Sequence, residues 1–283
     1  MASHYQKTFT NYLYLQRVAP STMEAYLRCV REVSSFHNQS ADTLDNDQIQ
    51  DYLLYCIQEK KLAWSSCNVL FSGLKKYYQG YLGRNNSKFS IPPRTRGKKL
   101  PMLLSQPEVL QLLEAPASLK HRALLATVYS SGLRVSEVVK IRPEHIESDN
   151  LRLKVEQGKG RKDRYTIMSS VCLETLREYW RAYQPGEWLF FGKDKSLPMP
   201  INTAQRIFYN AKKKARIEKG RGIHTLRHCF ASHLLENGTE IYAIKKWMGH
   251  SSIKTTYGYI QLSADYLSKT QSPLDRLYSG ETS

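Results

Sequence analysis

Histidine, arginine and tyrosine residues gather in residues 222–260, which read GIHTLRHCFASHLLENGTEIYAIKKWMGHSSIKTTYGYI. The polar and aromatic members of this run are His224, Arg227, His228, His250, Tyr257 and Tyr259. Arginine and histidine side chains donate hydrogen bonds to anionic oxygens. No aspartate or glutamate lies beside these residues in the sequence. The segment therefore predicts a site that binds an anion and not a metal ion.

Two short helices are predicted to position these groups. Apolar residues recur at helical spacing on both sides of a helix stop at Asn237–Gly238; they are Phe230, Leu234, Leu235, Ile241, Ile244 and Trp247. Gly249 is expected to end the second helix just before His250. Turns at these places would let His224, Arg227 and His250 face a common cleft. A third helix from near Ser252 would carry Tyr259.

The pattern HTLRH, then GH, then a tyrosine nine positions beyond the second histidine resembles the catalytic half of the tyrosine recombinase (phage integrase) family. Tyr259 stands at that ninth position, and Tyr257 does not. Two further stretches match the family's motifs. The stretch SGLRVSE resembles its first arginine motif and singles out Arg134, and GKGRKDR resembles its lysine hairpin and singles out Lys159.

The resemblance implies a DNA strand-exchange enzyme in which Tyr259 attacks a phosphodiester and forms a 3′-phosphotyrosine. A phenol with a pKa near ~10 is a weak nucleophile unless positive charge stabilises the phenolate. Arg134 and Arg227 would hold the non-bridging oxygens, and Lys159 would protonate the leaving 5′ oxygen. His224 would assist proton transfer, and His250 would donate a hydrogen bond to the phosphate.

The implied reaction needs no metal, ATP or other cofactor. Glu137 is expected to orient the arginine of its own motif. His224 and His228 have the i, i+4 spacing of a zinc pair, but HTLRH lacks the internal glutamate of HExxH, and its arginine would repel a cation. His228 is therefore interpreted as a structural residue. Tyr257 is the competing nucleophile, and spacing favours Tyr259.

Charge and composition agree with a polyanionic partner. The 283 residues carry 42 Lys and Arg against 25 Asp and Glu, for a net charge of +17. Basic side chains that neutralise phosphates release counterions from DNA. An anionic membrane surface is the competing partner, but no apolar stretch approaches the ~18 residues of a spanning helix. The five scattered cysteines indicate buried free thiols in a reducing compartment.

Residues 1–83 are predicted to form four helices, and the resemblance implies that these are a SAM-like core-binding domain that faces DNA. Helix starts are expected at a capping box of Ser21 and Glu24, and again at Asp45. A basic linker is predicted over 84–101, where Pro92–Pro93 breaks any helix. The catalytic domain would fill 102–283 and open with a second capping box at Ser105.

Within the catalytic domain, a helix is expected to end at Gly132, and the next to begin at Arg134 and run to Ile141. Residues 151–155 and 164–168 alternate as two strands of a hairpin whose tip carries Lys159. A helix over 201–214 ends in Lys212–Lys214, predicted to contact phosphate, and a tail helix is expected over 263–277. The fold class is thus mainly α with a small antiparallel β-sheet.

The resemblance favours a compact, Xer-like or mobile-element integrase, acting in DNA integration, excision or resolution. Its working form would be a homotetramer on double-stranded DNA and a monomer when free, with accessory DNA-bending proteins as further partners. We expect a cytoplasmic, nucleoid-associated protein without membrane contact. The alternatives are a type IB topoisomerase-like nicking-closing enzyme, a DNA-binding regulator with a vestigial site, and a metal-dependent nuclease. The nuclease would need clustered carboxylates, which the catalytic half lacks.

Overall fold

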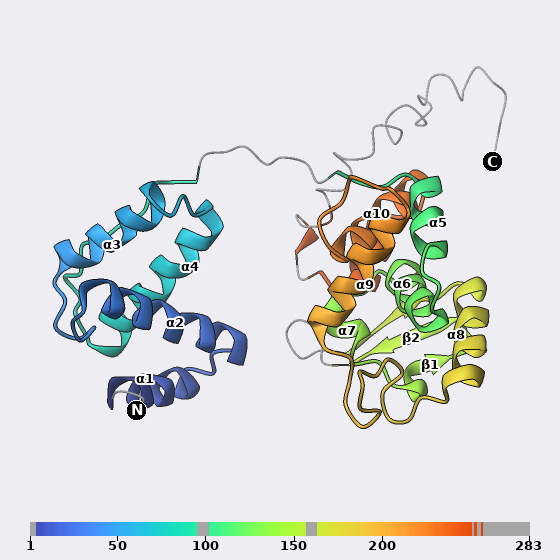
Figure 1. Ribbon diagram of the computed structural model, residues 1–283, viewed down its shortest axis with the longest axis horizontal. Helices are drawn as coiled ribbons and strands as arrows, with labels where there is room; N and C mark the ends of the chain where they lie inside the picture. Colours follow the sequence, from blue (N-terminus) through green and yellow to red (C-terminus); the bar gives the residue numbers. More distant parts are fainter. Residues whose placement is uncertain (1–3, 95–101, 157–162, 251, 254–255, 257–283) are drawn as a thin grey trace, which may run out of the picture. The chain divides into compact units, whose positions relative to one another are not determined.

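A computed structural model describes residues 4–94, 102–156, 163–250, 252–253 and 256. The chain divides into two compact units, residues 1–98 and 99–283 (Figure 1). Lys159, Tyr257, Tyr259 and the expected tail helix over 263–277 lie outside the described residues. No helix among those described is long and apolar enough to cross a membrane.

The N-terminal unit is helical, as the sequence predicts. Tyrosines and phenylalanines fill much of its core, and the ring of Phe9 packs edge-on against that of Tyr77 at 4.9 Å. Its elements are α1 (His4–Leu15), α2 (Pro20–His37), α3 (Asn46–Gln58), α4 (Trp64–Lys75) and a π-helical turn (Lys76–Tyr81).

Two predicted helix starts in this unit have different outcomes. Asp45 caps α3 by accepting a hydrogen bond from the backbone N–H of Gln48, whose side chain returns the bond. The expected capping box at Ser21 is wrong, because α2 already begins at Pro20, and its cap residue Ala19 has no capping side chain. A proline in the first helical position has its backbone angle set for the helix and lacks the N–H that a cap would satisfy.

The predicted linker over 84–101 begins too early. Arg84 donates hydrogen bonds to the carbonyls of Asp42 and Leu44, and Phe89 is buried in the core of the N-terminal unit. Trp64 donates its indole N–H to the carbonyl of Pro92 at 3.0 Å. Residues 84–92 therefore pack on the N-terminal unit, although their composition is that of a linker.

The second unit is mainly helical with one small sheet, which confirms the predicted fold class. Its helices are α5 (Gln106–Glu114), α6 (Leu119–Ser131), α7 (Val135–Val138), a 3₁₀ turn (Pro143–His145), α8 (Ser170–Tyr183), α9 (Ile201–Lys214), α10 (His224–Glu236) and α11 (Ile241–Met248). Ser105 caps α5 in the predicted box with Glu108. The helix predicted to run from Arg134 to Ile141 is shorter, because α7 ends at Val138.

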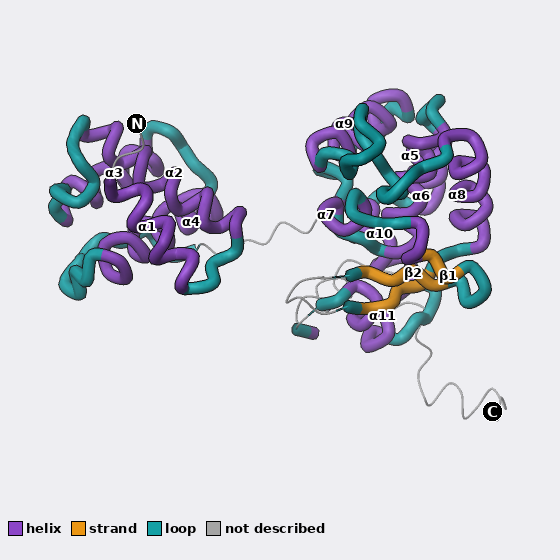
Figure 2. The backbone as a smooth tube through the Cα atoms, turned by 90° about the horizontal axis from the view of Figure 1, so that it is seen from below, coloured by secondary structure: helices purple, strands orange, loops and turns teal. Residues whose placement is uncertain are grey.

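The three strands pair antiparallel in the order β1 (Ile146–Glu147), β2 (Arg152–Val155) and β3 (Arg164–Ile167) (Figure 2). The predicted hairpin of β2 and β3 is confirmed, with Val155 opposite Arg164. Leu153, Val155 and Thr166 are buried, so one face of the hairpin packs against the helices. Helix α11 packs on β3, and α10 packs on α6.

Candidate active site

Arg134 lies at the sharp junction between α6 and α7. Gly132 ends α6 in the left-handed conformation, with φ +60°. A β-carbon at this position would stand 2.3 Å from the ring of Phe230, so α10 packs directly on the glycine. Glycine is required here both by the backbone angle and by space. The turn brings the Arg134 side chain, only partly exposed, to the beginning of α7.

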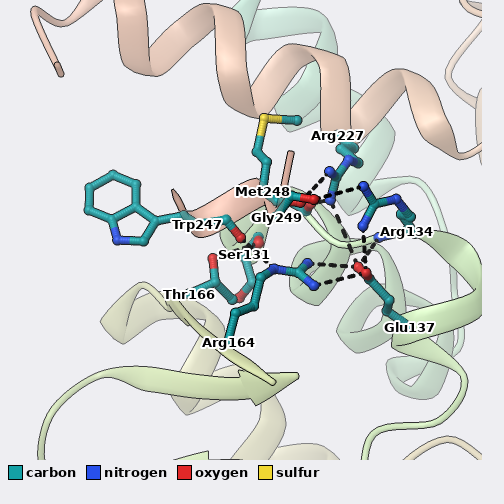
Figure 3. A network of polar contacts seen from close by, with 10 residues as sticks. Ser131, Arg134, Glu137, Arg164, Thr166, Arg227, Trp247, Met248 and Gly249 are labelled. Carbon is teal, nitrogen blue, oxygen red and sulfur yellow. Dashed lines mark hydrogen bonds and ion pairs between the residues drawn. The ribbon is translucent and has the colours of Figure 1, made fainter. Parts of the chain in front are cut away.

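Three arginines converge on the carboxylate of Glu137 (Figure 3). Arg134 donates from Nη1 to Oε1 at 2.7 Å and from its backbone N–H to Oε2 at 2.8 Å. Arg164 forms two parallel bonds, Nη1 to Oε1 at 2.9 Å and Nη2 to Oε2 at 2.8 Å. Arg227 Nη1 lies 3.8 Å from Oε2. The predicted pairing of Glu137 with Arg134 is confirmed, and the carboxylate serves all three guanidinium groups.

The same arginines bind the last carbonyls of α11, one carbonyl each. Arg164 Nε donates to Trp247 O at 2.8 Å, Arg227 Nη2 to Met248 O at 2.6 Å, and Arg134 Nη2 to Gly249 O at 3.4 Å. Carbonyls at a helix C-terminus lack partners within the helix and carry its negative dipole end, so cations stabilise them. Since His250 follows directly, this arrangement fixes where that histidine leaves the helix.

Arg227 also ties α10 to the end of α6. Its side chain is 5% exposed, and it donates to the carbonyl of Gly132 through Nη1. Nearby, the hydroxyl of Thr166 donates to Ser131 O at 2.9 Å. The first arginine motif, the strand β3 and the HTLRH helix are therefore joined around one point, although they lie far apart in the sequence.

The histidines of the site have lowered pKa values. Burial lowers the pKa of His224, and the positive charges of Arg227 and Arg134 lower it further. Burial, followed by the charges of Arg227, Arg134 and Arg164, lowers the pKa of His250 to about 4. Both rings are therefore neutral at pH 7 in the absence of an anion, and a bound phosphate would raise their pKa values.

His250 interacts with Thr256, whose hydroxyl oxygen lies 3.0 Å from Nδ1. When that hydroxyl donates to Nδ1, the ring proton is on Nε2 and is oriented for donation. His228, read from the sequence as structural, is half-buried on α10, and burial and the charges of His224 and Arg227 lower its pKa. The described residues hold no group of three or more metal-ligating side chains.

A cavity of about 560 Å³ opens beside Arg134 and Glu137. Its other lining residues include Lys140, Lys154 and Trp188. One predicted phosphate contact has a different role. Lys212 donates to the carbonyls of Glu218 at 2.6 Å and Gly220 at 3.0 Å, and so holds the loop that precedes α10.

Of the six residues singled out by the sequence, the structure brings Arg134, His224, Arg227 and His250 into one region. These four perturb one another's charge or share Glu137. Arg164 is not one of the six. Strand alternation was the available signal, because it puts Arg164 on the same face as Thr166, which is buried. A buried arginine needs an anionic partner.

Comparison with known proteins gives two family matches. Residues 101–265 match the phage integrase family, and residues 6–87 match the N-terminal SAM-like domain of phage integrases. A protein of Sinorhizobium fredii named integrase/recombinase y4qK is 36% identical over 258 residues, covering 91% of this chain and 84% of that protein. The tyrosine recombinase XerC of Lactobacillus leichmannii is 29% identical over 289 residues, covering 93% of this chain and 95% of XerC.

Solved structures show the same similarity. A XerA recombinase is 25% identical with a TM-score of 0.56, and the match covers 100% of both chains. A lambda integrase dimer bound to a COC′ core site has a TM-score of 0.71 at 18% identity, covering 90% of this chain and 96% of that one. At that identity the likeness is one of fold.

Proposed function

Because this chain belongs to the phage integrase family, whose members are tyrosine recombinases that exchange DNA strands in site-specific recombination, we propose that Tyr259 is its nucleophile and that Arg134, Lys159, His224, Arg227 and His250 assist it. The positions of Arg134 and Arg227 are the main support for this proposal. They come from two distant segments, yet both guanidinium groups lie against one buried carboxylate, at 2.7 and 3.8 Å.

In the proposed first step, Tyr259 Oη attacks the phosphorus of a DNA phosphodiester. The new O–P bond forms as the bond to the 5′ oxygen breaks, which leaves a 3′-phosphotyrosine. The ammonium of Lys159 gives a proton to the leaving 5′ oxygen. His224 takes the phenolic proton, a role that suits an imidazole whose pKa is lowered by burial and by Arg227.

The non-bridging oxygens of the phosphate would be held by Arg134, Arg227 and the Nε2 proton of His250. Charge develops on these oxygens in the transition state, so donors fixed beforehand lower the barrier, each by ~3–4 kcal/mol in comparable sites. The three-arginine arrangement supplies this positive charge from the protein's own residues. A 5′ hydroxyl from a second strand then reverses the steps, and the energy of the phosphodiester is conserved without ATP.

We extend the proposal to assembly. Strand exchange needs two cleaved duplexes, so the working form is proposed to be a homotetramer on double-stranded DNA that assembles from monomers, with DNA-bending proteins as accessory partners. The division of roles predicted from the sequence, with the N-terminal unit binding the core site and the second unit carrying the chemistry, is part of the same proposal. The protein would act at the nucleoid.

The test is covalent trapping on nicked DNA in EDTA, with substrate drawn from the sequence that flanks the gene. Wild type is compared with Tyr259→Phe, and Tyr257→Phe is the matched control two residues away. We expect an SDS-resistant protein–DNA adduct in wild type and in Tyr257→Phe, and none in Tyr259→Phe. Loss in Tyr257→Phe alone would move the nucleophile to Tyr257. Absence of an adduct on DNA that the protein binds would contradict the proposal.

A further inference from the structure

The Arg164–Glu137 pair is the most fully bonded ion pair among the described residues of the site. Both side chains are largely buried, with exposed fractions of 10% and 7%. The two parallel N–H···O bonds match the planar fork of a guanidinium to the two oxygens of a carboxylate (Figure 3). The guanidinium of Arg134 donates one hydrogen bond to the same carboxylate. Arg164 is thus the principal partner of Glu137.

From this geometry we propose that Arg164 is a positioning residue for DNA cleavage. It neutralises Glu137, so that the charges of Arg134 and Arg227 remain available to the phosphate. The inference rests on the proposed function of those two arginines. One carboxylate faces three guanidinium groups, and with Arg164 removed it would be balanced by Arg134 and Arg227 alone. Their combined field at the phosphate would fall, and the carboxylate would draw Arg134 toward itself.

A second contact joins Arg164 to helix α11, which precedes His250. Its Nε donates to Trp247 O at 2.8 Å, in the last turn of α11. Gly249 follows with φ +63°, and a β-carbon there would lie 2.9 Å from Cδ of Arg164. The Arg164 side chain therefore packs directly against Gly249, at the turn that leads to His250. Loss of Arg164 would loosen the position of His250 as well as the charge balance.

Arg164 also begins strand β3 and stands five residues after Lys159 in the sequence. Its bonds to Glu137 and Trp247 anchor the start of this strand to α7 and α11. The Arg164 side chain therefore links three elements. They are α7 in the first arginine motif, strand β3 after Lys159, and α11 just before His250. A lysine in its place could keep the charge but could not form both parallel bonds.

The experiment compares cleavage rates of wild type, Arg164→Gln, Arg164→Lys, Glu137→Gln and the double variant on nicked DNA. DNA binding and thermal unfolding are measured on the same samples. We expect Arg164→Gln to cleave roughly 100-fold more slowly, the usual scale for small misplacements in active sites. Arg164→Lys should lie between Arg164→Gln and wild type. The double variant should cleave at least tenfold faster than Arg164→Gln, because a glutamine at 137 no longer competes for Arg134 and Arg227.

The pKa of His250, measured by NMR titration, is a second readout. It should rise in Arg164→Gln, because Arg164 is one of the charges that lower it. The control is Arg152→Gln on strand β2, which removes a half-exposed arginine paired with Glu147 at 3.0 Å. This variant should cleave within twofold of wild type.

Each outcome decides. An Arg164→Gln variant that cleaves at the wild-type rate overturns the inference, as does a folded, slow Arg164→Gln variant that the second substitution does not rescue. Should Arg164→Gln fail to fold, Arg164→Lys takes its place, and a folded lysine variant as inactive as Tyr259→Phe overturns the inference. Lack of cleavage in wild type would instead contradict the proposed function.

Discussion

Glu137 couples the chemistry of the site to the stability of the catalytic unit. Burial alone would raise the pKa of this carboxyl. The hydrogen bonds and charge of Arg164, and then the hydrogen bonds of Arg134, outweigh burial and lower that pKa from 4.5 to about 2. A carboxyl whose pKa falls on folding stabilises the folded state above its unfolded pKa. A shift of this size corresponds to roughly 3 kcal/mol at neutral pH, lost as the pH falls from about 4.5 to about 2.

Glu137→Gln should therefore lower the unfolding free energy of the catalytic unit by roughly 3 kcal/mol at pH 7, since it leaves buried arginines without their counter-charge. The deficit relative to wild type should shrink as the pH falls from 4.5 towards 2, because Glu137 takes up its proton in the unfolded chain before it does so in the folded protein. Urea unfolding followed by tryptophan fluorescence measures this. A Trp64→Phe background leaves only the tryptophans of residues 99–283.

Glu144→Gln is the control at the residue scale. Glu144 is exposed and lies 3.5 Å from Arg142, and such surface pairs contribute at most about 1 kcal/mol. This variant should keep the wild-type unfolding free energy both at pH 7 and below pH 4.5. An equal and small effect of the two substitutions would mean that the three-arginine cluster does not depend on its carboxylate for stability.

At the scale of elements, the site depends on how closely α10 crosses the end of α6. Gly132→Ala should lower the unfolding free energy by roughly 2–4 kcal/mol. The left-handed backbone costs a side chain about 1 kcal/mol, and the clash with Phe230 at 2.3 Å adds an overpacking term of about 1–3 kcal/mol. Because Arg227 bonds to Gly132 O, cleavage should fall as well.

Gly238→Ala separates the backbone cost in that prediction from the cost of the clash with Phe230. Gly238 follows α10 with φ +80°, and a β-carbon there meets nothing within 4 Å. It should therefore show the backbone cost alone, and urea denaturation of both variants measures the difference. A Gly132→Ala protein no less stable than Gly238→Ala would contradict the close packing of α10 on this turn.

Local signals explain which elements could be predicted from the sequence. The caps at Asp45 and Ser105 and the stop at Gly132 depend on residues within one turn, so their patterns were sufficient. The start of α2 was misplaced by two residues, with the cap at Ser21 in place of Ala19, because Pro20 and Ser21 both favour a helix start. Arg84 bonds to a carbonyl 40 residues away, and Phe89 packs on the rings of Phe71 and Tyr78 in two other elements, which composition does not show.

The candidate site follows the same rule. Motif spacing identified Arg134, His224, Arg227 and His250, and adjacency in the motif identified Glu137. Arg164 was missed because its partners, Glu137 and Trp247, are 27 and 83 residues distant. Only the register of β3 and the packing of α11 on that strand bring them together.

At the scale of the whole molecule, the excess of positive charge predicts that DNA affinity depends on the salt concentration. With a net charge of +17, affinity should fall linearly on a plot of log K against log salt, with a slope of about −0.9 for each phosphate contacted. Contacts near the site should contribute to that slope, whereas distant surface charges should not. The salt slope therefore tests where the duplex lies on the catalytic unit.

Lys140 is the residue to test, because it is exposed and lines the same cavity as Arg134 and Glu137. Lys140→Gln should weaken binding to all sequences and reduce the magnitude of the slope by about 0.9, the value for one phosphate. Arg181→Gln, on the exposed face of α8, removes the same charge and should leave the slope unchanged. Fluorescence anisotropy across a salt series measures both. Equal slopes for Lys140→Gln and wild type would mean that the DNA backbone does not pass over this cavity, and the phosphate path would then have to approach Arg134 from the side of α10.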